Sequence, residues 1–195
     1  MKKDIILAGV GGQGILSIAA SIGMAAISSG LHLKQAEVHG MSQRGGDVHS
    51  DLRISDKEIA SDLIPEGKAD MVISVEPMES LRYVPMLSSD GWLVTNITPY
   101  MNIPNYPDIE ALITAVKSFP NHIAIDADKI ASDIGHKRSA NMVILGAASL
   151  FVGIEFHQIE KAVMNLFRSK GTEVIEANLK ALRAGHEFAL NYIKV

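Results

Sequence analysis

Cysteine is absent from the 195-residue sequence. Its absence excludes disulfide bonds, thiolate nucleophiles, zinc–thiolate sites and iron–sulfur clusters ligated by this chain. A redox metal centre that works with the protein must therefore belong to another chain. The seven histidines are scattered and include no H-x-x-x-H pair, so we predict no metal site either.

The sequence also has no excess of positive charge and no apolar run of membrane-spanning length. The formal net charge is −4 and the sequence pI is near 6.0, which argues against nucleic acid and against an anionic membrane as partners. The longest apolar stretch, Asn141 to Ile154, is shorter than the ~20 residues that span a membrane, and a buried helix explains it better. The apolar run after the two N-terminal lysines indicates a strand, because it is too short for a signal peptide. We expect a cytoplasmic protein.

Familiar catalytic signatures are missing as well. The sequence has no G-x-S-x-G elbow, and no GK[ST] follows its glycines, so P-loop nucleotide hydrolysis is not indicated. No catalytic residue is predicted. The function must be sought in binding motifs instead.

The most informative stretch is DIILAGVGGQG at residues 4–14. Four apolar residues predict a buried parallel strand, and the glycines that follow keep the G-x-G-x-x-G order that opens a Rossmann-like helix. Such a loop lets the backbone approach an anion at the positive end of the helix, but it also serves to pack a helix tightly onto a strand, and the sequence favours neither interpretation. The candidate binding residues here are Gly9, Gly11, Gly12, Gln13 and Gly14.

A second candidate stretch is HGMSQRGG at residues 39–46. Arg44 combines a fixed positive fork with the backbone turn of Gly45 and Gly46, which suits a carboxylate, a phosphate or an acidic residue of a partner. A salt bridge within the fold is the competing interpretation. Glu37, at the end of the next predicted strand, is a weaker candidate for a ribose ligand.

The remaining pattern predicts an α/β fold: a Rossmann-like, mostly parallel sheet with an antiparallel strand or hairpin and a C-terminal helical extension. Alternation in residues 47–54 predicts a half-exposed antiparallel strand, whose polar face meets solvent or a partner subunit. The tract 98–107, with three prolines, is the best candidate for a partner-binding loop. We expect one domain, 1–195, with a sheet core at about 1–126 and a helical tail at about 127–195. Further strands are predicted at 31–38, 69–75, 91–97 and 122–125, and helices at 15–30, 77–86, 109–119, 141–152, 156–171 and 175–195.

Five motifs carry a resemblance over almost the whole chain. They are GVGGQG at 9–14, EVHGMSQRGG at 37–46, DLIPEGKAD at 62–70, EPMESLR at 76–82 and NMVILGA at 141–147. In this order they resemble the beta subunit of indolepyruvate ferredoxin oxidoreductase, the free-standing form of the gamma domain of 2-oxoacid:ferredoxin oxidoreductases.

The resemblance implies oxidative decarboxylation of an aryl 2-oxoacid, with coenzyme A as acyl acceptor and ferredoxin as electron acceptor. It also implies that thiamine diphosphate, Mg²⁺ and [4Fe–4S] clusters reside in a large (alpha) catalytic subunit, and that no cofactor is bound by this chain alone. The missing cysteines agree with that division. The isolated chain is accordingly predicted to be inactive.

Two other classes remain open at this stage. A stand-alone NAD(P)-binding oxidoreductase would use the glycines with Glu37, but it lacks a recognisable catalytic pair. An adenylate-forming enzyme of the ubiquitin-activating type also carries G-x-G-G-x-G, but usually adds cysteines that this chain does not have.

Overall fold

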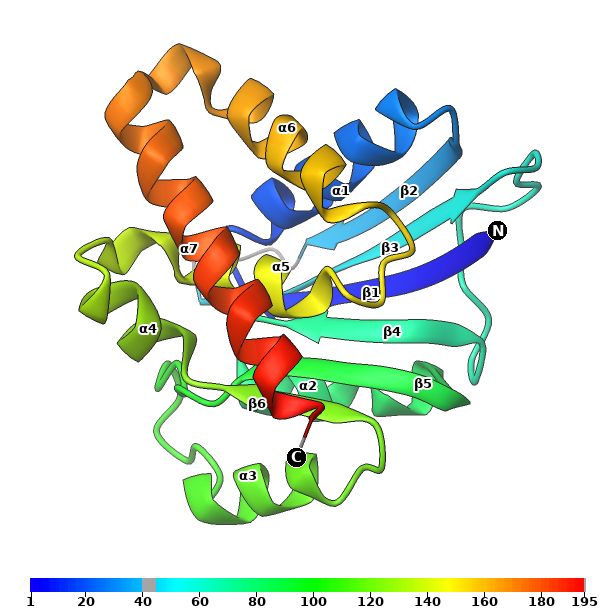
Figure 1. Ribbon diagram of the computed structural model, residues 1–195. Coiled ribbons are helices and arrows are strands. Elements are labelled where there is room, and N and C mark those ends of the chain that lie inside the picture. The colour runs from blue at the N-terminus through cyan, green and yellow to red at the C-terminus, as the bar shows by residue number, and fades with distance from the viewer. Residues whose placement is uncertain (40–44, 195) are drawn as a thin grey trace.

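The structure is a computed structural model that describes residues 1–39 and 45–194. Its strands form one sheet in the order β2-β3-β1-β4-β5-β6 (Figure 1). Strands β1, β4, β5 and β6 run parallel to one another, whereas β3 is antiparallel to both β1 and β2. The predicted fold class is therefore confirmed. The strands are β1 (Lys2–Val10), β2 (His32–His39), β3 (Asp47–Ser55), β4 (Ala69–Ser74), β5 (Leu87–Asn96) and β6 (His122–Ile125).

Helices cover both faces of the sheet. Side chains of α1, α5, α6 and α7 pack on one face, and those of α2 and α3 pack on the other (Figure 1). The helices are α1 (Ile15–Ser28), α2 (Pro77–Arg82), α3 (Ile109–Lys117), α4 (Ala127–Asp133), α5 (Ala140–Ala148), α6 (Phe156–Leu166) and α7 (Thr172–Tyr192). Short 3₁₀ turns follow at η1 (Val84–Met86), η2 (Lys137–Ser139) and η3 (Arg168–Lys170).

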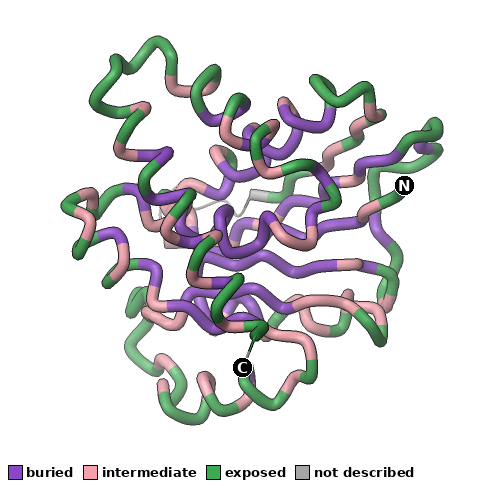
Figure 2. Tube along the Cα trace, viewed as in Figure 1, coloured by how far each residue is buried: buried purple, intermediate pink, exposed green. Residues whose placement is uncertain are grey.

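The central strands are apolar on both faces because helices cover both. Ile5 and Leu7 belong to the large core under α1, α5, α6 and α7, whereas Ile6 between them points to the smaller core under α2 and α3. Figure 2 shows the buried residues concentrated along these strands and in α5. The apolar stretch that begins at Asn141 is thus a buried helix, as predicted. In the two described ranges no helix is long and apolar enough to cross a membrane.

Helices α5 and α7 touch backbone to backbone. A Cβ atom added to Gly146 would lie 2.0 Å from the carbonyl oxygen of Leu182, and one added to Gly185 would lie 1.9 Å from that of Val143. No side chain fits at either position. The two glycines therefore set the distance at which α7 crosses α5.

Several predicted boundaries need correction. The helix predicted to run to about residue 86 ends at Arg82, and a 3₁₀ turn follows. Asp126 caps α4 by accepting a hydrogen bond from the amide of Lys129, whereas Ser139 precedes α5 without a capping hydrogen bond through its side chain. Gly171 does not end the helix before it, since α6 ends at Leu166 and Gly171 instead precedes α7.

Candidate functional site

The glycine loop lies between the carboxyl end of β1 and the start of α1, and side-chain hydrogen bonds hold it in place. Gln13 Oε1 accepts from the amide of Val10 at 2.8 Å, and Gln13 Nε2 donates to the carbonyl of Val75 at 3.4 Å. Asn141 Nδ2 donates to the carbonyl of Gly14 at 3.2 Å. Gln13 therefore ties the end of β1 to the segment after β4, and Asn141 ties the first turn of α1 to α5.

The individual glycines have different reasons to lack a side chain. A Cβ on Gly9 would lie 2.4 Å from Val75 Cγ2, so Gly9 serves tight packing of the loop against β4. Gly12 has a φ of +101°, and among the described residues no atom lies within 4 Å of its added Cβ, so its backbone conformation requires glycine. The packing interpretation is thus confirmed at Gly9, whereas Gly12 is required by its backbone conformation beside the pocket described below.

The stretches singled out in the sequence meet at one edge of the sheet. The amide of Gly11 donates to the carbonyl of Gly46 at 2.9 Å, and Asn102 Nδ2 donates to the carbonyl of Gly45 at 2.5 Å. The glycine loop, the Gly45–Gly46 turn and the proline-rich tract are therefore neighbours. Arg44, the other candidate of this turn, lies outside the described residues.

A pocket of about 350 Å³ opens at this edge, at the carboxyl ends of the parallel strands. Its polar lining combines the glycine loop with the turn before α5: Gly12, Gln13, Asn96, Lys137, Arg138 and Asn141. The carboxylate of Asp128 also borders it, but accepts a hydrogen bond from Asn96 Nδ2 at 2.7 Å. The two cations and the positive end of α1, whose first turn has no acidic residue, make the pocket suitable for an anion.

A larger cavity of about 750 Å³ adjoins the first and shares Lys137, Arg138 and Asn141 with it. It extends between η2 and the first turns of α7, where Phe167 and Val174 add apolar surface. The site thus has a charged centre with an apolar extension. Lys137 and Arg138 were missed by the sequence reasoning; the only signal for them is a basic pair just before an apolar helix.

The prediction that β3 exposes a polar face is wrong at Asp51 and Arg53, because other segments of the chain cover these two side chains. Arg53 forms an ion pair with the buried Asp4, at 2.8 Å from Nε to Oδ1, and donates to carbonyls of the 61–63 segment. Asp51 accepts a hydrogen bond from the amide of Ile64 at 3.0 Å. Neither side chain is available to a partner subunit.

Asp47 and His49, on the same face of β3, form a polar cluster with residues in and just after α2. Tyr83 donates to Asp47, 3.0 Å away at Oδ2, and its hydroxyl lies 2.7 Å from His49 Nδ1. Burial raises the pKa of the Glu79 carboxyl, although the adjacent Arg82 guanidinium opposes the shift. Burial likewise raises the pKa of the Tyr83 hydroxyl, and the charge of Asp47 adds to this effect. These groups brace the strand that follows the Gly45–Gly46 turn.

Glu37 does not occupy the position that a ribose ligand needs. Strand β3 lies between β1 and β2, and Glu37 is opposite Ser50, which is in turn opposite Leu7. Two strand spacings separate Glu37 from β1, which amounts to about 10 Å. Its carboxylate also accepts a hydrogen bond from Gln35 at 2.6 Å. The topology therefore disfavours the nicotinamide interpretation.

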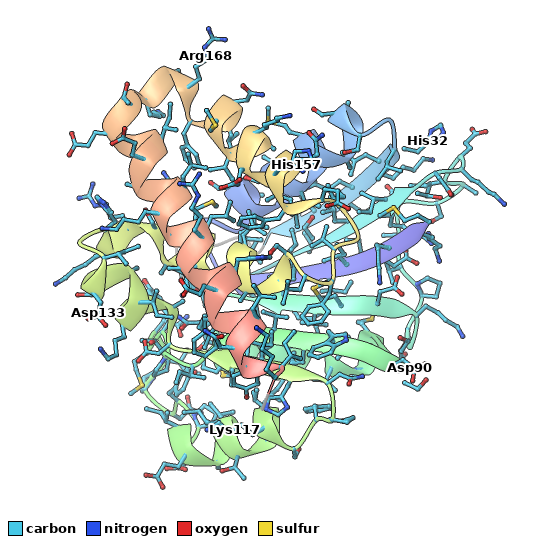
Figure 3. All side chains as sticks on the ribbon, viewed as in Figure 1. His32, Asp90, Lys117, Asp133, His157 and Arg168 are labelled. Carbon is cyan, nitrogen blue, oxygen red and sulfur yellow. The ribbon has the colours of Figure 1, made fainter. Side chains whose placement is uncertain are left out.

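The residues present do not fit a resident metal cofactor. An iron–sulfur cluster would need cysteines that the sequence does not contain. Within residues 1–39 and 45–194, no three histidine, aspartate or glutamate side chains are placed to hold a metal ion. Figure 3 shows two of the histidines, His32 and His157, on separate outer parts of the molecule.

Comparisons with known proteins agree with one another. A family model described as pyruvate ferredoxin/flavodoxin oxidoreductase matches residues 4–188. A curated protein of Pyrococcus horikoshii, named indolepyruvate oxidoreductase subunit IorB, is 36% identical over 95% of this chain and 95% of its own. In a solved structure, the gamma subunit of a keto/oxoacid ferredoxin oxidoreductase from Geobacter sulfurreducens PCA is 27% identical, with a TM-score of 0.71, over 97% of this chain and 99% of that one.

A longer protein contains the same fold as one part. The 2-oxoglutarate:ferredoxin oxidoreductase of Magnetococcus marinus, solved with 2-oxoglutarate, coenzyme A and succinyl-CoA bound, matches 97% of this chain with a TM-score of 0.76 at 23% identity. The matching region is only 31% of that chain. The fold therefore occurs both as a separate chain and within a larger one.

Proposed function

Because the chain belongs to the pyruvate ferredoxin/flavodoxin oxidoreductase family, we propose that it is the small, cluster-free subunit of an indolepyruvate-type 2-oxoacid:ferredoxin oxidoreductase. The complex would oxidise and decarboxylate aryl 2-oxoacids, with coenzyme A as acyl acceptor. The observation that carries this proposal is the 36% identity to the Pyrococcus IorB protein, which extends over nearly the full length of both chains.

The proposed division of labour places the redox cofactors elsewhere. Thiamine diphosphate, Mg²⁺ and [4Fe–4S] clusters are assigned to a large alpha subunit, and ferredoxin is reached through the assembled complex. The support is chemical, because this chain has no cysteine to ligate a cluster. We propose accordingly that the isolated chain is inactive and that the complex is cytoplasmic.

The part of the reaction that we assign to this chain is to bind and orient coenzyme A. Its phosphates would lie against the glycine loop, residues 9–14, near the positive end of α1, and would pair with the cations of Lys137 and Arg138. The turn of Arg44, Gly45 and Gly46 would border the same ligand. The support is the pocket itself, whose lining joins the glycine loop to a basic pair at the carboxyl edge of the sheet.

We also propose that residues 1–195 act as a single domain. The helical part at 127–195 supplies α5, α6 and α7, whose apolar side chains share one core with β1, β4 and α1. A sheet fragment ending near residue 126 would leave that core open to water. The two parts are thus expected to unfold in one transition.

Reconstitution tests the function. The chain and its large subunit are produced separately, and indolepyruvate- and coenzyme A-dependent reduction of ferredoxin is measured for each alone and for the mixture. Activity should appear only on mixing, with the two proteins co-eluting on gel filtration. Full activity of the isolated chain, or micromolar nicotinamide binding with no effect on the large subunit, would refute the subunit assignment.

A further inference from the structure

Exposed apolar side chains gather on one loop of the carboxyl edge. Tyr100, Met101 and Ile103 are 43%, 67% and 40% exposed, although they lie within four consecutive positions. The segment that carries them, residues 97–107, contains no charged residue. Single exposed apolar residues are normal on a protein surface, but a contiguous group of this kind marks an interaction site.

The loop is held in this conformation by buried polar contacts. Glu76 is fully buried, and its Oε1 atom accepts hydrogen bonds from the amide of Tyr100, at 3.2 Å, and from the hydroxyl of Tyr106. Its other oxygen caps α2 by accepting from the amide of Glu79 at 2.8 Å. Asn102 fixes the tip of the loop to Gly45. The apolar side chains are thus presented to solvent by an anchored backbone.

Composition and anchoring together fit the centre of a protein interface. Interface centres are depleted in charged residues and enriched in tyrosine and methionine, which describes residues 97–107. An anchored loop also loses little conformational entropy when a partner binds, so more of the contact energy contributes to affinity.

We propose that residues 97–107 form the docking surface for the large, cofactor-bearing subunit, and that this contact places the large subunit beside the glycine loop. The inference rests on the proposed function. The choice of partner follows from the Magnetococcus enzyme, in which this fold is 31% of a longer chain and so is covalently joined to the rest of the enzyme. A free-standing chain must secure the same association through its surface. The hydrogen bonds from Asn102 to Gly45 and from Gly11 to Gly46 place that surface beside the glycine loop.

The test measures the affinity of the full-length chain for the purified large subunit by calorimetry. Met101→Asp should raise the dissociation constant about tenfold or more, because it puts a charge at the centre of an apolar contact. Ile103→Asp is a second, independent variant. The matched control is Ile27→Asp on α1, which charges a side chain that is 62% exposed but lies outside the loop, and should change the affinity less than twofold. Melting temperatures show whether each variant is folded.

The possible outcomes distinguish failure of the docking surface from failure of the proposed function. If the wild-type chain binds and the loop variants lose no more affinity than Ile27→Asp, the docking surface is refuted and the proposed function stands. If the wild-type chain does not bind the large subunit, both fail together. If the isolated chain is a dimer that Met101→Asp dissociates without affecting binding to the large subunit, the loop joins two copies of this chain and the proposal is wrong.

Discussion

The crossing of α5 and α7 and the glycine loop both depend on glycine, but for opposite reasons. At Gly146 and Gly185 the added Cβ would overlap a backbone carbonyl oxygen, so the requirement is for space inside the core. At Gly12 the added Cβ would meet no atom of the described residues, so the requirement is for a positive φ beside an open pocket.

Within a single motif, some glycines are therefore required by packing and others by backbone conformation. Gly9 resembles the helix crossing, since its added Cβ would overlap Val75 and Ile15, whereas Gly12 faces the pocket. A glycine signature therefore contains positions that hold the fold together and others that shape a site. Substitutions at the two kinds of position should affect different measurements.

The largest effect is expected at the helix crossing. Gly185→Ala would place a methyl group 1.9 Å from the carbonyl oxygen of Val143, which belongs to rigid backbone, so α7 must move away from α5. We expect the free energy of unfolding to fall by about 3 kcal/mol or more. Urea unfolding measures it. Gly135→Ala is the control, because it has a positive φ but no atom within 4 Å, and should lose only about 1 kcal/mol. Equal losses would show that crowding at the crossing is not limiting.

A smaller, paired effect is expected within the glycine loop. Gly9→Ala crowds the buried side chains of Val75 and Ile15 and no backbone atom, so it should lower the unfolding free energy by about 1–3 kcal/mol. Gly12→Ala should cost only about 1 kcal/mol of backbone strain, yet raise the KM for coenzyme A in the reconstituted complex. Unfolding curves and coenzyme A titrations of both variants test whether the effects on stability and on KM are separate. If Gly9→Ala changed the KM more than Gly12→Ala, the assignment of the two positions would be reversed.

The basic pair, Lys137 and Arg138, provides the next test, at the pocket beside the glycine loop. Replacing Lys137 or Arg138 by alanine should raise the KM for coenzyme A about tenfold, because each loses a charge-assisted hydrogen bond, with little change in melting temperature. Increasing salt should raise the KM of the wild-type complex more than that of the variants. Lys117→Ala, on α3 away from the pocket (Figure 3), is the matched control and should leave the KM unchanged. If neither substitution changed the KM, the phosphates of coenzyme A would bind elsewhere and the role assigned to the basic pair would be wrong.

The sequence predicted those parts of the fold that local pattern determines. Continuous apolar strands, the glycine turn and the buried helix after Asn141 were all identified from residue type and spacing. The insertion of β3 between β1 and β2 was not, because strand order depends on pairing between distant segments that periodicity does not encode. That missed insertion is what made Glu37 look like a ribose ligand.

The candidate site was only half visible in the sequence for the same reason. The glycine loop and the Gly45–Gly46 turn carry local signatures. Lys137 and Arg138 lie more than 120 positions after the loop and reach the pocket only because α5 packs against the start of α1. The anchoring role of Glu76 was also missed, since a buried glutamate that caps a helix and holds a loop has the same sequence appearance as a surface one.

The smallest expected effect concerns the crossing of α5 and α7 and depends on pH. His186 stacks on Phe156 beside the helix crossing, and its Nδ1 lies 2.7 Å from the hydroxyl oxygen of Ser149. The Ser149 hydroxyl also donates to the carbonyl of Gly146, an arrangement that suits the His186 tautomer protonated at Nδ1. Burial lowers the pKa of His186, with the charge of Glu160 opposing the shift. Protonation at Nε2 is therefore less favourable in the folded chain than in the unfolded one.

Stability should consequently decrease as the pH falls from the ordinary histidine pKa near 6.5 towards the lowered folded value, because the unfolded chain binds more protons in that window. Above pH 7 both states are neutral and the contribution is constant. His186→Phe keeps the ring and removes the titration, so its unfolding free energy should depend less on pH between 7.5 and 5.5 than that of the wild type. His157→Asn, which removes an exposed histidine from α6, shows how much of the change follows from losing any histidine (Figure 3). If the unfolding free energies of wild type and His186→Phe changed with pH in parallel, the charge state of this ring would not contribute to the stability of the helix crossing.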